Sequence, residues 1–90
     1  MGSSRLKVPG GKMIEAEVEL EGGVIRRAKI TGDFYFHPEE ELEVLEEALR
    51  GVAIHAVEDV IKRFLSERGI VLVGINVEDI VKVVTDAAKK

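Results

Sequence analysis

Residues 12–21 of this 90-residue chain read KMIEAEVELE and alternate strictly between apolar and acidic side chains after the first lysine and methionine. The apolar members are Ile14, Ala16, Val18 and Leu20. Side chains on a β-strand point in turn to the two faces of a sheet, so this period predicts a half-buried strand. One face would enter a core, and the four glutamates between and after the apolar residues would face water.

A second strand is predicted at residues 24–31, joined to the first through a pair of glycines at 22–23. A two-residue turn at these glycines would place Val18 opposite Arg27 and mix core with charge. A three-residue loop instead sets apolar residues opposite one another, as Leu20 with Val24, Ala16 with Ala28 and Ile14 with Ile30. We therefore predict the three-residue loop. Arg26 then lies on the apolar face, where it would snorkel past an edge or serve a ligand or partner.

The rest of the chain predicts one short strand and helices. Residues 34–36, FYF, favour a third strand with two aromatic side chains on the core side. Apolar side chains at helical spacing predict helices from Pro38 to a stop at Gly51, over residues 53–67, and from a cap at Asn76. Residues 70–75, between the last two helices, are predicted to be a buried extended segment or a minor strand.

This order of elements predicts the α+β fold class. A small antiparallel sheet, made of the β-hairpin plus the short third strand, would be covered by three helices. Residues 1–90 would form a single domain with a thin core. Residues 1–4 could be native or a remnant of cloning and are left out of this fold prediction.

Composition excludes several classes of function. The net charge is −4 and there is no Trp, which argues against nucleic acid as a partner. The absence of Cys excludes disulfides and thiolate metal sites, and two histidines offer little for zinc. No apolar run approaches the ~20 residues of a membrane span, so we expect a cytoplasmic protein. Gln is missing and Asn occurs once, a bias typical of thermophiles.

Residues 7–12, KVPGGK, are the candidate anion-handling turn. The proline has a fixed φ and no N–H, and Gly10 and Gly11 can adopt positive φ. Such a turn would present bare amides between Lys7 and Lys12, which suits a phosphate or a partner surface. A plain turn before a strand is the alternative, because no helix follows as in a P-loop.

Other polar residues favour structural roles. Asp33 follows Gly32 between two predicted strands and would cap backbone amides or, less simply, face a ligand. His37 precedes a helix start, and His55 would pair with an acidic residue four positions later. The glutamates of residues 39–47 are typical of a solvated helix face, although they could also steer a basic partner. No complete catalytic group emerges, so we expect the chain not to be catalytic on its own.

Four segments, taken in order, resemble the C-terminal accessory domain of lipoate-protein ligases. They are KVPGGK at residues 7–12, ITGDF at 30–34, ALRG at 48–51 and GINVEDI at 74–80. In that family the accessory domain is sometimes a separate small subunit of a bipartite ligase, an arrangement seen in archaea. The resemblance covers nearly the whole chain and implies the same α+β fold.

The resemblance also implies a heterodimer with a catalytic large subunit. That subunit binds lipoate and ATP with magnesium, forms lipoyl-AMP, and passes the lipoyl group to a lysine of an acceptor protein. The accessory chain would bind no cofactor alone and would meet the acceptor only indirectly. The residues that match the family's motifs, and would lie near the partner or the adenylate, are Lys7, Gly10, Gly11, Lys12, Gly32 and Asp33. The family fold is shared with iron–sulfur scaffold proteins, but without Cys that function is removed.

Two alternatives remain open. A self-associating structural module without ligase activity would explain the surplus of aliphatic residues, including Val44 and residues 70–75. A small anion- or nucleotide-binding protein acting alone would rest only on the glycine–glycine–lysine turn at 10–12.

Overall fold

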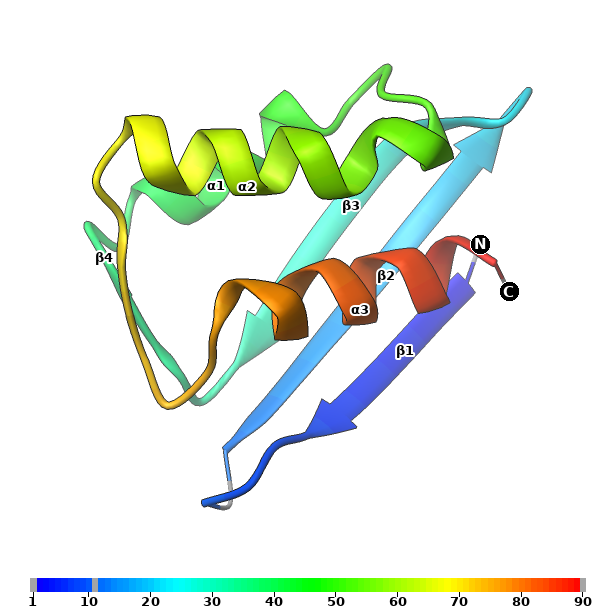
Figure 1. The fold of residues 1–90 in the computed structure, drawn as a ribbon. Coiled ribbons are helices and arrows are strands. Elements are labelled where there is room, and N and C mark those ends of the chain that lie inside the picture. Colours follow the sequence, from blue (N-terminus) through cyan, green and yellow to red (C-terminus); the bar gives the residue numbers. More distant parts are fainter. Residues whose placement is uncertain (1, 11, 90) are drawn as a thin grey trace.

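A three-stranded antiparallel sheet forms one layer of the protein, and the helices lie together on one of its faces (Figure 1). The computed structural model describes residues 2–10 and 12–89. The strands of this sheet, in spatial order, are β1 (Gly2–Lys7), β2 (Met13–Glu21) and β3 (Val24–Gly32). The helices are α1 (Glu41–Ala48), a short 3-10 turn η1 (Ile54–Ala56), α2 (Val57–Glu67) and α3 (Val77–Ala88). The predicted α+β class, a small antiparallel sheet with three helices, is confirmed.

The third strand of the sheet differs from the predicted one. It is β1, whose first residues were left out of the fold prediction, and it pairs along its length with β2. Only Leu6 is a large apolar residue in β1, so the segment lacks the alternation that would have identified it. The predicted strand at 34–36 exists as β4 (Tyr35–His37), but it pairs with β5 (Val71–Val73) in a separate two-stranded sheet.

The outer edge of β3 is already occupied, which explains why β4 does not pair there. The segment after α1 bonds to the start of β3: Ile25 N–H donates to Val52 O at 2.8 Å, and Gly51 N–H donates to Ile25 O at 2.7 Å. Further along, Ile30 N–H donates to Glu46 Oε2 of α1 at 2.7 Å. The chain therefore turns away from the large sheet after β3, and β4 pairs with β5 instead.

The β2–β3 turn is tighter than predicted. Gly22 and Gly23 have φ of +62° and +82°, the positive values that a two-residue hairpin turn requires. A β-bulge then shifts the register, because Leu20 lies opposite Ile25 whereas Glu19 lies opposite Arg27. The three-residue register is therefore wrong, although apolar residues still oppose apolar ones. The true pairs are Val18 with Ala28 and Ala16 with Ile30.

The bulge also accounts for Arg26. It is the extra residue between the two registers, its side chain is exposed, and Nη1 lies 3.0 Å from Glu21 Oε2. The guanidinium therefore does not lie on the apolar face, as the three-residue register had required.

Helix boundaries differ from the predicted ones at the N-termini. Pro38 lies in a turn in which its carbonyl accepts from Glu41 N–H at 3.0 Å, and α1 begins only at Glu41. Residues 54–56 form η1, so α2 begins at Val57. The cap of α3 is confirmed: Asn76 and Asp79 each accept a hydrogen bond from the other's backbone N–H, at 3.2 and 2.9 Å.

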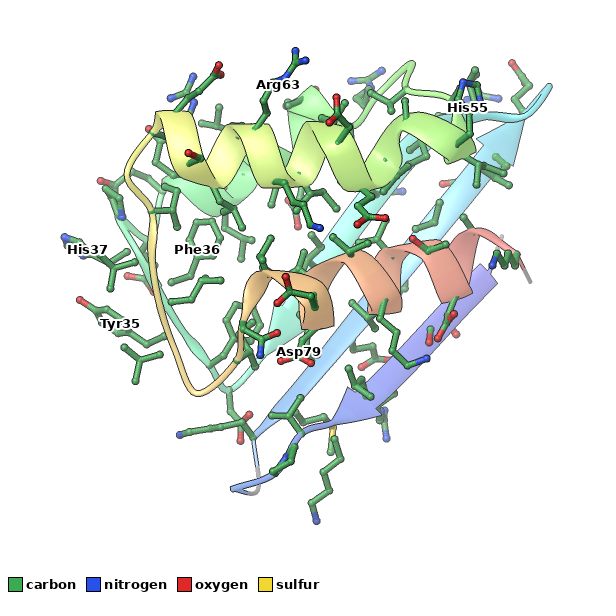
Figure 2. The ribbon with its side chains drawn as sticks, in the orientation of Figure 1. Tyr35, Phe36, His37, His55, Arg63 and Asp79 are labelled. Atoms are coloured by element: carbon green, nitrogen blue, oxygen red, sulfur yellow. The ribbon has the colours of Figure 1, made fainter. Side chains whose placement is uncertain are left out.

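The core lies between the sheet and the helices, and α3 packs across β1 and β2. Among the residues that the structure describes, every buried residue is apolar or glycine. Figure 2 shows Phe36 of β4 reaching toward this core. Within residues 2–10 and 12–89, every helix is too short or too polar to cross a lipid bilayer.

Candidate functional site

The turn between β1 and β2 carries the lysines predicted to contact a partner or anion. Val8 is buried, and its N–H donates to Lys12 O at 2.9 Å, which closes the turn. Lys7, Gly10 and Lys12 are exposed, and Gly10 has a φ of +98° with open space around it. Gly11 lies outside the described residues. The predicted geometry, a glycine turn between two exposed lysines, is therefore present at Gly10.

Asp33 fixes this turn to the end of β3. Met13 N–H donates to Asp33 Oδ1 at 2.6 Å, and Asp33 N–H donates to Met13 O at 3.2 Å. The preceding Gly32 has to be a glycine, since a Cβ atom there would lie 2.3 Å from Met13 O. The backbone-capping role predicted for Asp33 is thus what its side chain does. It anchors the residue that directly follows Lys12.

A third segment, the loop after β5, contacts the β1–β2 turn at Lys12. Gly74, which directly follows β5, packs against the Lys12 side chain: a Cβ atom at Gly74 would lie 2.9 Å from Lys12 Cγ and 3.3 Å from Cε. Ile75 is buried, and Asn76 caps α3. The Lys12 side chain therefore lies beside Gly74, at the start of the β5–α3 loop.

These three turns form one surface feature, which we name the turn cluster. It consists of residues 7–10 and 12 around the β1–β2 turn, the Gly32–Asp33 turn, and the β5–α3 loop at residues 74–76 (Figure 1, lower left). Segments more than 60 residues apart in sequence are thus joined by direct contacts. Three of the four segments that resemble the lipoate ligase accessory domain contribute to it.

The turn cluster offers positive charge and backbone rather than catalytic groups. Its described side chains supply exposed ammonium groups at Lys7 and Lys12 and a carboxylate, Asp33, that is engaged with the backbone. In the part of the chain that the structure describes, no three His, Asp or Glu side chains gather as a metal site. Such a surface is suited to contact an anion or another protein.

The two histidines lie elsewhere. His37 is exposed on β4 and stacks on Tyr35, with ring centroids 5.8 Å apart and ring planes 5° apart. His55 lies in η1 at the opposite end of the molecule (Figure 2). The residue expected to pair with His55, Asp59, instead lies with its Oδ2 3.5 Å from Arg63 Nη2.

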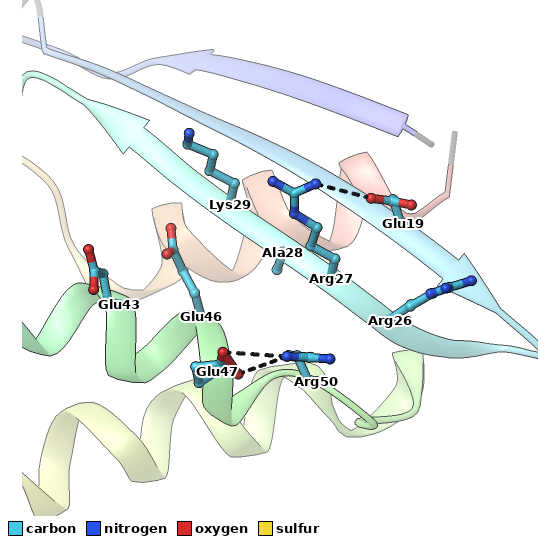
Figure 3. A pocket seen from close by; sticks show the side chains of 9 residues that line it. All are labelled: Glu19, Arg26, Arg27, Ala28, Lys29, Glu43, Glu46, Glu47 and Arg50. Carbon is cyan, nitrogen blue, oxygen red and sulfur yellow. Dashed lines mark hydrogen bonds and ion pairs between the residues drawn. The ribbon is translucent and has the colours of Figure 1, made fainter.

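A groove with a volume of about 740 Å³ runs between β3 and α1 (Figure 3). Its walls carry both signs of charge, in the residues Glu19, Arg26, Arg27, Ala28, Lys29, Glu43, Glu46, Glu47 and Arg50. Several of these charges pair within the groove: Arg27 Nη1 lies 3.6 Å from Glu19 Oε2, and Arg50 Nη1 lies 3.3 Å from Glu47 Oε2. The groove lies away from the turn cluster.

Sequence reasoning missed the role of Glu46. It belongs to the glutamate run predicted to be a solvated helix face, yet its carboxylate accepts a hydrogen bond from Ile30 N–H, on the outer edge of β3. The run looks uniformly acidic, so only the place of α1 beside β3 distinguishes Glu46 from its neighbours.

Comparisons with known proteins identify the family of this chain. The family described as bacterial lipoate protein ligase C-terminus matches residues 3–84. Lipoate-protein ligase A subunit 2 of Thermoplasma acidophilum is 33% identical over 70 residues, which cover 78% of this chain and 73% of that protein.

A solved structure gives the same result at the level of the fold. One chain in the structure of a bi-partite lipoate protein ligase and its E2 lipoyl domain, from Thermoplasma acidophilum, superposes with a TM-score of 0.83. That chain is 31% identical, and the match covers 90% of each chain. Family match, sequence identity and fold agree: this chain belongs to the family of lipoate-protein ligase C-terminal domains.

Proposed function

We propose that this chain is the small, accessory subunit of a two-chain archaeal lipoate-protein ligase. In this proposal it binds the catalytic large subunit and supports ATP-dependent formation of lipoyl-AMP, the first step of protein lipoylation. The related protein from Thermoplasma acidophilum, a ligase subunit 2, supports the assignment to a bipartite enzyme. Lipoate, ATP and magnesium belong to the complex, and the lipoyl acceptor meets this chain only through it.

The observation that carries the proposal is the turn cluster. It brings the described site residues onto one surface: Asp33 accepts a hydrogen bond from the backbone beside Lys12, and Gly74 lies against the Lys12 side chain. The sequence predicted Lys7, Gly10, Gly11, Lys12, Gly32 and Asp33 as site residues, but it did not show that Gly74 contacts Lys12. An exposed cationic turn suits a helper subunit that acts at another subunit's active site.

The role we assign to the turn is electrostatic. Adenylation develops negative charge on the phosphates of ATP and on the departing pyrophosphate. An ammonium group held at that point stabilises this charge without reorganising, because its position is set before the reaction. The contact of the Lys12 stem with Gly74 restricts where its ammonium group can lie.

The test is the rate of lipoyl-AMP formation by the cognate large subunit, measured with and without this chain. We expect the wild-type chain to accelerate adenylation and Lys12→Ala to reduce kcat at least about tenfold, as loss of one charge-stabilising group does elsewhere. Lys82→Ala is the matched control, since Lys82 lies on α3 and pairs with Asp86 at 3.2 Å. Equal rates for Lys12→Ala and wild type would remove Lys12 from the mechanism. No acceleration by the wild-type chain would overturn the accessory role.

A self-associating module is the second candidate, and exposed apolar side chains favour it. Val44, Val71 and Val73 have exposed fractions of 38%, 49% and 57%. Light scattering on a mixture of this chain and the large subunit separates the two candidates. A one-to-one heterodimer supports the accessory role, whereas a homodimer that leaves the large subunit free supports the alternative.

A further inference from the structure

The small β4–β5 sheet exposes an apolar surface that we name the β4–β5 outer face, consisting of Tyr35, His37, Val71 and Val73. The register sets Tyr35 opposite Val73 and His37 opposite Val71, so these four side chains share one side of the sheet. Tyr35, Val71 and Val73 have exposed fractions of 51%, 49% and 57%. The rings of Tyr35 and His37 stack on each other and form an aromatic platform beside the valines.

Within residues 2–10 and 12–89, only the inner side of this sheet is covered by other parts of the protein. Phe36 is buried, and Leu72 directly opposite it is half-buried against the core. Figure 2 shows Phe36 reaching inward, whereas Tyr35 and His37 point away from the body of the molecule. A two-stranded sheet has little stability of its own, so one with a bare apolar side gains from a second covering layer.

Ion pairs lie on other outer surfaces of the described chain. On the helix-free face of the large sheet, Arg5 lies 3.5 Å from Glu15. On α2, Lys62 Nζ lies 2.7 Å from Glu58 Oε2, and this hydrogen bond raises the pKa of Lys62 above its ordinary value. Three of the four exposed large apolar side chains found in the described residues belong to the β4–β5 outer face, and the fourth is Val44 on α1. An apolar surface on a partner protein is therefore complementary to the β4–β5 outer face.

The β4–β5 outer face adjoins the turn cluster. Val73 directly precedes Gly74, and Tyr35, its cross-strand partner, lies two residues after Asp33. A hollow of about 390 Å³ opens beside it, lined in part by Phe34, Tyr35, His37 and Leu42. Four side chains are fewer than the ~20 residues a side of a stable interface, so a partner seated here extends onto neighbouring surface. The turn cluster is that neighbour.

We propose that the β4–β5 outer face is the apolar docking surface for the catalytic large subunit. This inference rests on the proposed function, because it assigns the surface through which the accessory chain is held. The partner patch is apolar and uncharged, and an apolar side chain of the large subunit enters the hollow beside Tyr35. The Tyr35–His37 platform and the two valines supply the affinity, and docking there sets the turn cluster against the large subunit.

The test measures the Kd of the large subunit for full-length variants by calorimetry. Val73→Glu places a charge in the centre of the apolar face, and we expect a Kd at least about tenfold weaker than wild type. The matched control is Val44→Glu, the same change at an exposed valine on α1, for which we expect a Kd within about twofold of wild type. Val73→Glu could disrupt the short strand β5. Val71→Thr and Val73→Thr therefore test the same face, because threonine is β-branched like valine and keeps the preference for a strand.

The outcomes separate this inference from the function on which it rests. If the wild-type chain binds the large subunit tightly, and Val73→Glu and the threonine variants bind it as tightly, the proposed docking surface is wrong and the accessory role stands. If the wild-type chain does not bind the large subunit, the docking surface and the accessory role are both wrong. A photoreactive phenylalanine analogue at position 35 should cross-link to the large subunit, whereas one at Glu17, on the helix-free face, should not. Cross-links only between two copies of this chain would overturn the proposal in favour of a homodimer.

Discussion

The carboxylate of Asp33 holds the turn cluster together, and its effect on stability can be measured directly. Its Oδ1 accepts from Met13 N–H at 2.6 Å, a hydrogen bond to a charged acceptor. Such bonds contribute about 1.5–3 kcal/mol, and this site is exposed, so we expect Asp33→Ala to lower the free energy of unfolding by about 1–2 kcal/mol. Urea denaturation followed by circular dichroism gives this difference.

Two further variants at the residue scale show whether the hydrogen bond is responsible. Asp33→Asn keeps an acceptor and should retain more than half of the stability that Asp33→Ala loses. Asp59→Ala, which removes an exposed carboxylate 3.5 Å from Arg63, should cost less than about 0.5 kcal/mol. A loss for Asp33→Ala no larger than that for Asp59→Ala would show that the capping bond adds nothing.

At the level of elements, α1 protects the outer edge of β3 through Glu46. Glu46 Oε2 accepts from Ile30 N–H at 2.7 Å in a partly buried position. Glu46→Ala leaves that backbone donor without its partner, so we expect a loss of about 1–2 kcal/mol in the free energy of unfolding. Amide exchange at Ile30, read by NMR, should become faster than in the wild-type chain.

The neighbouring glutamate provides the control for this prediction. Glu47 is exposed on the same helix and lies 3.3 Å from Arg50, so Glu47→Ala should change stability by less than about 0.5 kcal/mol. It should also leave exchange at Ile30 unchanged. Equal effects of Glu46→Ala and Glu47→Ala would mean that edge protection comes from helix packing alone.

The same elements show how far the sequence predicts structure. The alternation in β2, the aromatic pair around Tyr35 and the cap at Asn76 are local patterns, and each predicted its element. The β-bulge at Arg26 was not predicted. The register was chosen only between loops that leave each residue of one strand paired with a single residue of the other. A bulge removes that constraint: it allows the tight glycine turn and still restores the apolar pairs beyond it.

At the scale of the whole molecule, pairings between distant segments escaped prediction. β1 joins the sheet through backbone bonds to β2, and β4 finds β5 across more than 30 residues, and neither pairing has a signature in composition. The turn cluster is of the same kind. Its lysines, Gly32 and Asp33 were predicted one by one, with Asp33 correctly assigned to the backbone, but the contact of Lys12 with Gly74 depends on the complete fold.

A chain of 90 residues with one bare apolar face should become more stable when the large subunit covers it. A partner that binds only the folded state stabilises it by RT ln(1 + [L]/Kd), or about 2.7 kcal/mol when the partner is at 100 times Kd. Core amides that exchange through global unfolding should then exchange about 100-fold more slowly. Hydrogen exchange with mass spectrometry resolves peptides of this chain, such as those of β2 and α3, from those of the large subunit. Lys82→Ala should be slowed as much as wild type, whereas Val73→Glu at the same concentration of large subunit should be slowed at least about tenfold less. Core exchange that the large subunit leaves unchanged would show that the two chains do not form the proposed complex.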